Sequence, residues 1–273
     1  MLSIQRLRDG ALLACEDRLA VEAALELRLT HPALGTAPVA VATTLRTPGE
    51  DSDLAIGHLY AEGLIESRAD VLGVHPCKGP VQALRVDLHI DARVPDLKSL
   101  RRHGTLSSAC GACGKVAADA LRAEAVGARV RGSARLAATS LCALPDRLRS
   151  AQTAFATTGG VHGVGLFGYD GELLALREDV GRHNALDKLI GHALQQGGLP
   201  WTDHALLWSG RASFELLQKA ARAGASLVAA IGAPSSLAVE VAQRAGITLV
   251  GFLSPQGFNV YAGAERVVPE GSA

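Results

Sequence analysis

Residues 204–252 read HALLWSGRASFELLQKAARAGASLVAAIGAPSSLAVEVAQRAGITLVGF, and this stretch alternates between two kinds of apolar pattern. Short, continuous apolar runs at 204–208, 226–231 and 247–252 have the length of buried strands. The runs between them, at 213–223 and 235–245, carry apolar residues at helical spacing. Strands that alternate with helices through short links are typical of a parallel sheet covered by helices. The stretch therefore predicts an α/β domain.

The sequence on the N-terminal side extends this prediction to two domains. A further helix is expected to begin near Asp179, a suitable N-cap residue, or near Gly181, and to end at Gln196. Earlier in the chain, the patterns predict strands at 25–29, 39–43 and 83–90, a helix at 51–62, a loop at 92–114 and a helix at 115–124. We therefore expect an α+β domain over residues 1–125 and an α/β domain over residues 126–273.

The composition excludes several classes of protein. Of the 273 residues, 48% are hydrophobic and 20% are charged, which is enough apolar material for a buried core. Lys and Arg (27) balance Asp and Glu (27), so a strongly basic surface for nucleic acid is not expected. No apolar run approaches the roughly 20 residues that span a bilayer, and the start of the chain lacks a signal-peptide pattern. We expect a cytoplasmic protein without a nucleic-acid or membrane partner.

The sequence Cys110-Gly-Ala-Cys113-Gly holds the only close pair among the five cysteines. Three interpretations compete: a turn that happens to hold two thiols, half of a zinc site, and a reactive dithiol that carries a covalent group. A closed zinc site needs four ligands, and no second pair occurs at regular spacing. The flanking glycines, the expected helix after Cys113 and the nearby Arg101 and Arg102 all favour thiolate over thiol. The pattern therefore favours sulfur chemistry, and no metal ligands are assigned.

Polar residues follow the expected strands of the second half. Arg182 and His183 fall in the first turn of a helix, where cations oppose the helix dipole unless an anion lies opposite. Ser209-Gly210-Arg211 follows one strand, and the segment Phe252–Gly257 follows another, where open α/β sheets bind ligands. The Gly-rich stretch Thr158–His162 is expected to add a flexible wall. Together these segments predict an anion site, with phosphate as the natural ligand.

Four blocks of the chain, taken in order, resemble the FdhD family of formate dehydrogenase accessory sulfurtransferases. The blocks are CGACG at 110–114, REDVGRHNALDK at 177–188, SGRASFE at 209–215 and APSSLAVE at 233–240. Thr47-Pro-Gly followed by GHLYAEG at 57–63 resembles the N-terminal motif of that family.

The resemblance implies a sulfur carrier. Such a protein accepts persulfide sulfur from a cysteine desulfurase and passes it to the molybdenum (or tungsten) bis-guanine-dinucleotide cofactor of formate dehydrogenase or a related enzyme. It also implies a deaminase-like three-layer α/β second domain, a homodimer, and a cofactor that is bound as a client with no permanent cofactor. Cys110 and Cys113 would carry the sulfur. A cofactor-binding chaperone, whose cysteine pair is structural or binds zinc, is the alternative.

The resemblance and the strand-end argument together give one set of expected cofactor-binding residues. The set is Phe252, Leu253, Ser254, Pro255, Gln256, Gly257, Arg182, His183, Ser209, Gly210 and Arg211. The segment 252–257 contains no Arg, so its contacts with phosphate would come from the backbone.

Overall fold

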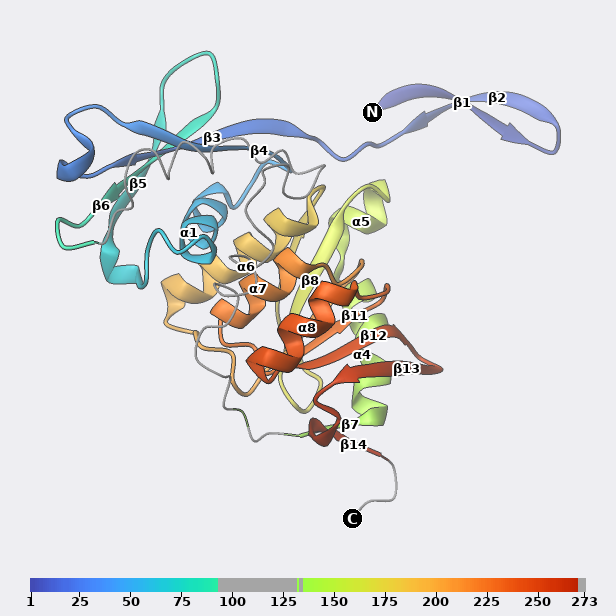
Figure 1. Ribbon diagram of the computed structural model, residues 1–273. Helices are drawn as coiled ribbons and strands as arrows, with labels where there is room; N and C mark the ends of the chain where they lie inside the picture. The colour runs from blue at the N-terminus through green and yellow to red at the C-terminus, as the bar shows by residue number, and fades with distance from the viewer. Residues whose placement is uncertain (93–131, 133–134, 270–273) are drawn as a thin grey trace.

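The computed structural model describes residues 1–92, 132 and 135–269. Its largest sheet has six strands (Figure 1). The strand order is β13-β12-β11-β10-β8-β9. The strands are β8 (His162–Phe167), β9 (Leu173–Asp179), β10 (Ala205–Trp208), β11 (Leu227–Ala230), β12 (Thr248–Ser254) and β13 (Gly257–Ala262). Strands β10, β11 and β12 run parallel, while β8, β9 and β13 pair antiparallel with their neighbours.

Helices cover both faces of this sheet (Figure 1). Side chains alternate across each strand, so Leu206 and Trp208 of β10 pack on one face and Ala205 and Leu207 on the other. The first face is covered by α6 (Arg182–Gln196), α7 (Phe214–Arg222) and α8 (Ser236–Ala245), and the second by α4 (Ala138–Ala151). The result is three layers, with the sheet in the middle.

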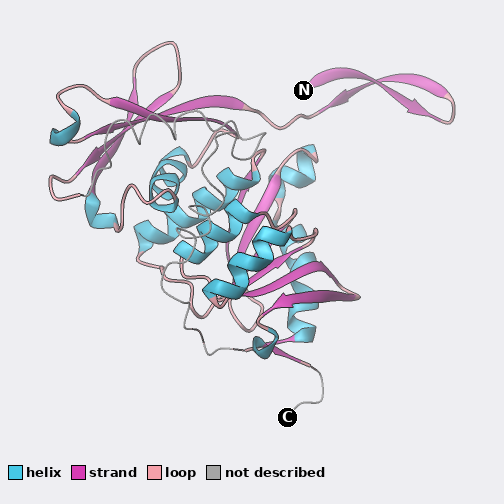
Figure 2. Cartoon of the chain, viewed as in Figure 1, coloured by secondary structure: helices cyan, strands magenta, loops and turns pink. Residues whose placement is uncertain are grey.

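A second, four-stranded sheet lies in the N-terminal part of the chain, in the order β4-β3-β6-β5. Its strands are β3 (Ala23–Thr30), β4 (Val39–Arg46), β5 (Val71–Cys77) and β6 (Ala83–Leu88). Its buried face packs against helix α1 (Asp51–Ala61), with Leu25, Leu27 and Val86 meeting Leu54 and Ile56. Helix α1 therefore lies between the two sheets (Figure 2).

Helices α1 and α6 touch through main chain at Gly57 and Gly191. A methyl group on Gly57 would overlap the carbonyl oxygen of Asp187, and one on Gly191 would overlap the carbonyl oxygen of Asp53. Glycine at both positions is therefore required by the close approach of the helices. This crossing fixes the N-terminal sheet and its helix against the larger sheet.

The first residues form a hairpin that stands away from the rest of the molecule (Figure 1). Strands β1 (Leu2–Arg8) and β2 (Ala11–Asp17) pair antiparallel, from Leu2 opposite Asp17 to Arg8 opposite Ala11. Leu7, Leu12 and Leu13 on this hairpin are each more than half exposed.

The remaining described elements are short. They are the 3-10 turns Pro32–Leu34, Arg68–Asp70 and Ala264–Arg266, helix α5 (Thr153–Thr158), and the paired strands β7 (Leu136–Ala137) and β14 (Val267–Val268). No helix in the described ranges is long and apolar enough to cross a membrane.

The structure confirms the mixed α/β character and corrects several details. The larger sheet is mixed, where a parallel sheet was predicted. The stretch Thr158–His162 is the ordered end of α5 and the start of β8, where a flexible wall was predicted. Strand β12 continues past Phe252 to Ser254. Of the two helix starts that were predicted, Asp179 and Gly181, the second agrees with the structure, since α6 begins at Arg182 with Gly181 as its N-cap. The domain boundary at residues 125 and 126 and the deaminase-like arrangement stay predictions.

Replacing Gly57 by Ala tests the helix crossing. Alanine in an exposed helix would be stabilising by roughly 0.5–1 kcal/mol relative to glycine. At this position the added methyl group must push α1 and α6 apart, so we expect the free energy of unfolding to fall by about 1–3 kcal/mol in urea denaturation. Gly79→Ala, where no atom lies within 4 Å of the added carbon, is the matched control and is expected to be near neutral. A Gly57→Ala variant as stable as the parent would contradict the crossing.

Candidate functional site

The candidate site is the edge of the larger sheet at which β10, β11 and β12 end. The backbone continues the sheet beyond these strands, because Gly232 N donates to Gly210 O at 3.0 Å and Phe252 N donates to Gly232 O at 3.2 Å. Helices α6, α7 and α8 all begin at this same edge. The edge therefore brings together strand ends and the positive ends of helix dipoles, as in ligand sites of open α/β proteins.

Two predicted residues, Ser209 and Gly210, form part of this edge as backbone. Ser209 N donates to Gly163 O at 3.0 Å, and Ser209 Oγ accepts from Gly163 N at 2.9 Å. The Ser209 hydroxyl thus ties the end of β10 to β8. A side chain on Gly210 would approach the ring of His162, with its first carbon 3.3 Å from Nδ1.

The predicted cations Arg182 and His183 lie in the first turn of α6. His183 Nε2 lies 2.8 Å from Glu215 Oε2 of α7, an ion-pair distance without hydrogen-bond alignment. Arg182 is half-buried and makes no hydrogen bond or ion pair with any residue that the structure describes. Arg211, exposed at the end of β10, likewise has no acidic partner in the described part of the chain. Two guanidinium groups without a partner among the described residues therefore lie at this edge.

Other residues of the block 177–188 point inward and join the two parts of the chain. Asp179 is fully buried, its Oδ2 lies 2.9 Å from Lys188 Nζ, and it accepts a hydrogen bond from Thr47 N. Lys188 Nζ donates to Thr47 O at 2.9 Å. Asn184 Nδ2 donates to Leu45 O at 2.7 Å. Asp179 is thus an ion-pair partner that links Thr47 to α6, where an N-cap was predicted.

A second buried ion pair is formed by Asp187, the residue that precedes Lys188 in α6. Lys219 Nζ of α7 is 2.7 Å from Asp187 Oδ2, and His58 Nδ1 of α1 is 3.3 Å from the same oxygen. Burial disfavours the charged carboxylate, but Lys219 and then His58 outweigh it and hold the pKa of Asp187 below its usual value. Burial likewise opposes the charge on Lys219, yet Asp187 and Glu62 raise its pKa. Both groups stay ionised and serve the structure.

The predicted segment 252–257 covers the end of β12, the turn at Pro255 and Gln256, and the start of β13. Phe252 holds an unusual conformation near the end of β12. Its φ is +53°, a left-handed value that is uncommon outside glycine, and its ring is 52% exposed. Leu253 is buried in the core facing α4, and Ser254 Oγ donates to Gly257 O at 3.1 Å. Pro255 and Gln256 are exposed at the tip. Of this predicted segment, Phe252 is the side chain that faces outward beside Gly232.

The candidate edge also includes His162 and Ser213, which were absent from the predicted set. His162 begins β8 beside Gly210. The Ser213 hydroxyl, at the N-cap of α7, is buried and has no hydrogen-bond partner in the described ranges. The sequence predicted His162 only as the last residue of the wall at 158–162, and it did not single out Ser213.

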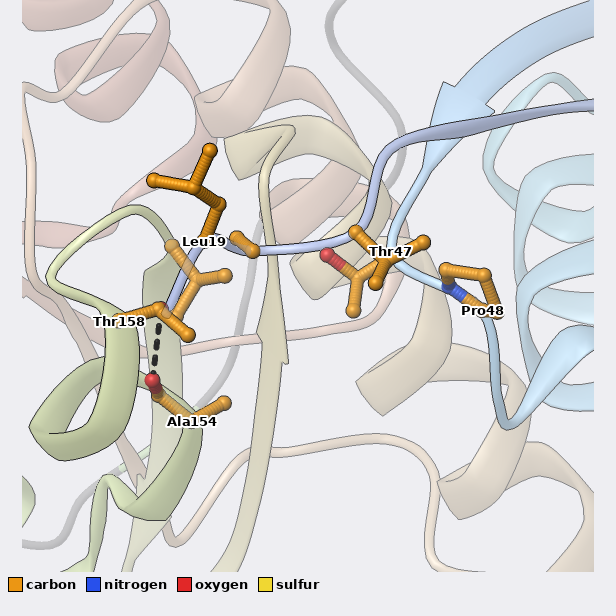
Figure 3. Close-up of a pocket in the computed structure, with 8 residues that line it drawn as sticks. Leu19, Thr47, Pro48, Ala154 and Thr158 are labelled. Carbon is orange, nitrogen blue, oxygen red and sulfur yellow. Dashed lines mark hydrogen bonds between the residues drawn. The ribbon is translucent and has the colours of Figure 1, made fainter. Parts of the chain in front are cut away.

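A separate cavity of about 350 Å³ lies near the base of the N-terminal hairpin (Figure 3). It is lined by Leu19, Ala20, Val21, Thr47, Pro48, Ala154, Thr158 and Val161. This lining is almost wholly apolar and holds no charged group. Val161 and His162 are neighbours in an extended segment, so their side chains point to opposite sides. The cavity is therefore distinct from the charged edge.

The two predicted sulfur-carrying residues, Cys110 and Cys113, lie outside the described residues. Within the described ranges, no group of three or more His, Cys, Asp or Glu side chains is arranged to hold a metal ion.

The fold and the edge described above define an α/β protein with a cation-bearing site at the ends of parallel strands. The model of the FdhD/NarQ family matches residues 21–268, and the chain belongs to this family. Relatives across bacteria and archaea are named sulfur carrier protein FdhD. That of Streptomyces coelicolor is 46% identical over 270 residues, which cover 96% of this chain and 93% of the relative. That of Sulfolobus acidocaldarius is 36% identical and covers 97% of both chains.

A solved structure has the same fold. A protein from Desulfotalea psychrophila, named as a formate dehydrogenase accessory protein, matches with a TM-score of 0.73 over 98% of both chains at 22% identity. The family to which the sequence motifs were compared is thus confirmed.

Replacing Asp187 by Asn tests the buried ion pair. The variant leaves Lys219 buried without its counter-charge, and we expect a loss of about 3–5 kcal/mol in the free energy of unfolding near pH 7. Because folding lowers the pKa of Asp187, its contribution is complete above the ordinary value of about 4 and is lost as the pH falls through the folded value.

Urea denaturation across this pH range checks that prediction. The difference between parent and variant should shrink below pH about 4. Asp203→Asn, at an exposed position, is the control. A variant of unchanged stability would mean that the pair does not hold α6 to α7.

Proposed function

We propose that this chain is a sulfur carrier that accepts persulfide sulfur from a cysteine desulfurase and transfers it to the molybdenum (or tungsten) bis-guanine-dinucleotide cofactor. The curated relatives are named sulfur carriers, and the structural neighbour is named for formate dehydrogenase, which supports the general role. The observation that carries the ligand part of the proposal is the pair Arg182 and Arg211. Unpaired guanidinium groups at helix starts suit an anionic ligand.

The sulfur step uses Cys110 or Cys113, with Cys110 as our assignment. The cysteine thiolate attacks the outer sulfur of the desulfurase persulfide. A new sulfur–sulfur bond forms on this chain, the donor's sulfur–sulfur bond breaks, and the donor cysteine leaves as a thiolate. The exchange needs no outside oxidant or reductant. For release, the thiolate of the second cysteine attacks the inner sulfur of this persulfide: a Cys110–Cys113 disulfide forms, the persulfide sulfur–sulfur bond breaks, and the outer sulfur leaves as sulfide for the metal. An external thiol reductant then restores the two thiols.

The cofactor is the substrate in this scheme, and its phosphates bind at the sheet edge. Arg182, His183 and Arg211 provide positive charge, and Ser209 and Gly210 form the wall between them. Phe252 offers an exposed aromatic face to a guanine ring, and the backbone of 252–257 contributes the rest. From Phe252 across Gly232 and Gly210 to His162 the edge crosses four strand positions, or roughly 14 Å at the usual strand spacing. That length suits a nucleotide better than a single phosphate ion.

The proposal includes partners and location. The cysteine desulfurase and formate dehydrogenase, or a related bis-guanine-dinucleotide enzyme, would meet this protein in the cytoplasm, and the chain would act as a homodimer.

Mass spectrometry of the sulfur-loaded protein tests the carrier step. After incubation with a cysteine desulfurase and cysteine, the parent should gain the mass of one sulfur atom per loaded thiol. Cys110→Ala should lose this adduct, and Cys142→Ala should keep it. Normal loading in both Cys110→Ala and Cys113→Ala would refute the carrier assignment. Stoichiometric zinc that disappears in the double variant would instead favour the cofactor-binding chaperone.

Calorimetric titration with guanosine and adenosine diphosphates tests the cofactor site. We expect the guanine nucleotide to bind more tightly. Arg182→Gln and Arg211→Gln should each weaken binding by about tenfold or more, since a charge-assisted hydrogen bond contributes about 1.5–3 kcal/mol. Arg8→Gln, on the exposed hairpin, is the matched control. Equal affinity for the two nucleotides, or none for either, would remove the proposed pocket.

A further inference from the structure

His162 lies at the proposed ligand edge, and neither the sulfur step nor the ion-pair networks use it. It begins β8, is half-buried, and its ring rests against the main chain of Gly210. Because Gly210 has no side chain, the imidazole has room at the point where β10 ends. The ring therefore lies at the edge, beside the end of β10.

The charged groups around His162 leave an excess of positive charge near its ring. From β9, Asp179 is its register partner, but that carboxylate is already paired with Lys188 at 2.9 Å. From α6, Arg182 and His183 act on the ring electrostatically. Glu215 of α7 lies against His183, and no described acidic group pairs with Arg182.

This environment keeps the imidazole neutral when nothing is bound. Burial first, then the charge of Arg182, and then the neighbouring imidazole of His183 lower the pKa of His162 below its ordinary value of about 6.5. Asp179 acts in the opposite direction but does not reverse the shift. Near pH 7 the ring therefore has one N–H donor and one acceptor nitrogen.

An anionic ligand would invert this balance. A pyrophosphate group near Arg182 and Arg211 adds negative charge beside His162, where the only described carboxylate that acts on the ring, Asp179, is paired with Lys188. A protonated imidazole is then favoured, because it is a cation with two N–H donors. Binding and protonation become linked, and each must strengthen the other by the same factor.

We propose that His162 is a proton-linked member of the phosphate site, neutral when the site is empty and protonated when a pyrophosphate ester binds beside Arg182 and Arg211. This inference rests on the proposed function and adds a pH-dependent residue to its ligand site. With the ester bound, His162 keeps its proton at pH values at which the imidazole of the free protein is already neutral. Affinity for the ester consequently rises as the pH falls from about 8 to about 6, by at most about tenfold per pH unit for one proton.

The test is calorimetric titration with a guanosine diphosphate sugar. Its pyrophosphate is esterified at both ends, so the ligand has no phosphate group that titrates near pH 7. Each titration is run at several pH values and in two buffers with different heats of ionisation, which gives the number of protons taken up. His162→Gln keeps a polar side chain of similar size but cannot titrate. His183→Gln removes the neighbouring imidazole, and His75→Gln, on the exposed edge of the N-terminal sheet, is the matched control.

We expect proton uptake approaching one per ligand in the parent and in His75→Gln. Uptake should persist in His183→Gln but at a smaller value, because loss of the neighbouring imidazole raises the pKa of His162 in the free state. His162→Gln should bind with an affinity that does not change with pH and without proton uptake. Binding by the parent that is independent of pH, or a pH slope that survives in His162→Gln, would overturn this inference and leave the cofactor site standing. No binding of the sugar nucleotide at any pH would overturn both. If His162→Gln fails to fold, the ring signals of His162 in the NMR spectrum of the parent, titrated with and without ligand, decide the question: an unchanged midpoint refutes the proposal.

Discussion

The contact of two helices through bare main chain, at Gly57 and Gly191, is the constraint on which the arrangement of this molecule depends. Backbone approach of this kind leaves no side chain to adjust, so α1 and α6 are held at one spacing. Buried ion pairs beside the crossing join Asp187 to Lys219 and Asp179 to Lys188. Since removal of one partner leaves a buried charge uncompensated, these pairs make each part of the chain depend on the other. The start of α6, and with it Arg182, is thereby placed at the edge of the larger sheet.

The block 177–188 has two functions: residues on the buried face of α6 stabilise the fold, and residues of its first turn lie at the candidate site. Asn184, Asp187 and Lys188 are spaced by three and four residues, lie on one face of α6 and are buried against its neighbours. Arg182 and His183 precede them in the first turn and remain at the edge. The many polar residues of the block therefore do not all belong to a ligand site. Most of them stabilise the position of the few that do.

The sequence predicted the parts of the fold that are governed by local pattern. The alternation over residues 204–252 corresponds to β10, α7, β11, α8 and most of β12, because each of these elements is a short, buried or amphipathic run. The antiparallel strands β8 and β13 escaped prediction. Gly163 and Gly165 made β8 resemble a loop. The path from β12 into β13 includes Phe252, whose φ of +53° cannot be predicted from the neighbouring sequence.

The candidate site was predicted in part for the same reason. Arg182, His183 and Arg211 do lie around one edge, since strand ends and helix starts follow from the element order. The stretch 158–162 was predicted to line the site, but the position of His162 beside Gly210 could not be predicted, because it depends on antiparallel pairing of β8 with β10 across more than 40 residues. The inward roles of Asp179 and Asp187 depend equally on partners far away in the chain. Cys110 and Cys113 lie outside the described residues, so their place relative to this edge stays a matter of prediction.

The hairpin of β1 and β2 has a consequence for how this protein behaves in concentrated solution. Its two strands pair only with each other among the described strands, so each outer edge offers unpaired N–H and C=O groups, and leucines are exposed along it. Such an edge is a template onto which any extended segment can add as a further strand. When many copies are crowded together, this projection is where unwanted association will start, and shortening it is the first change to make for a preparation that must stay clear.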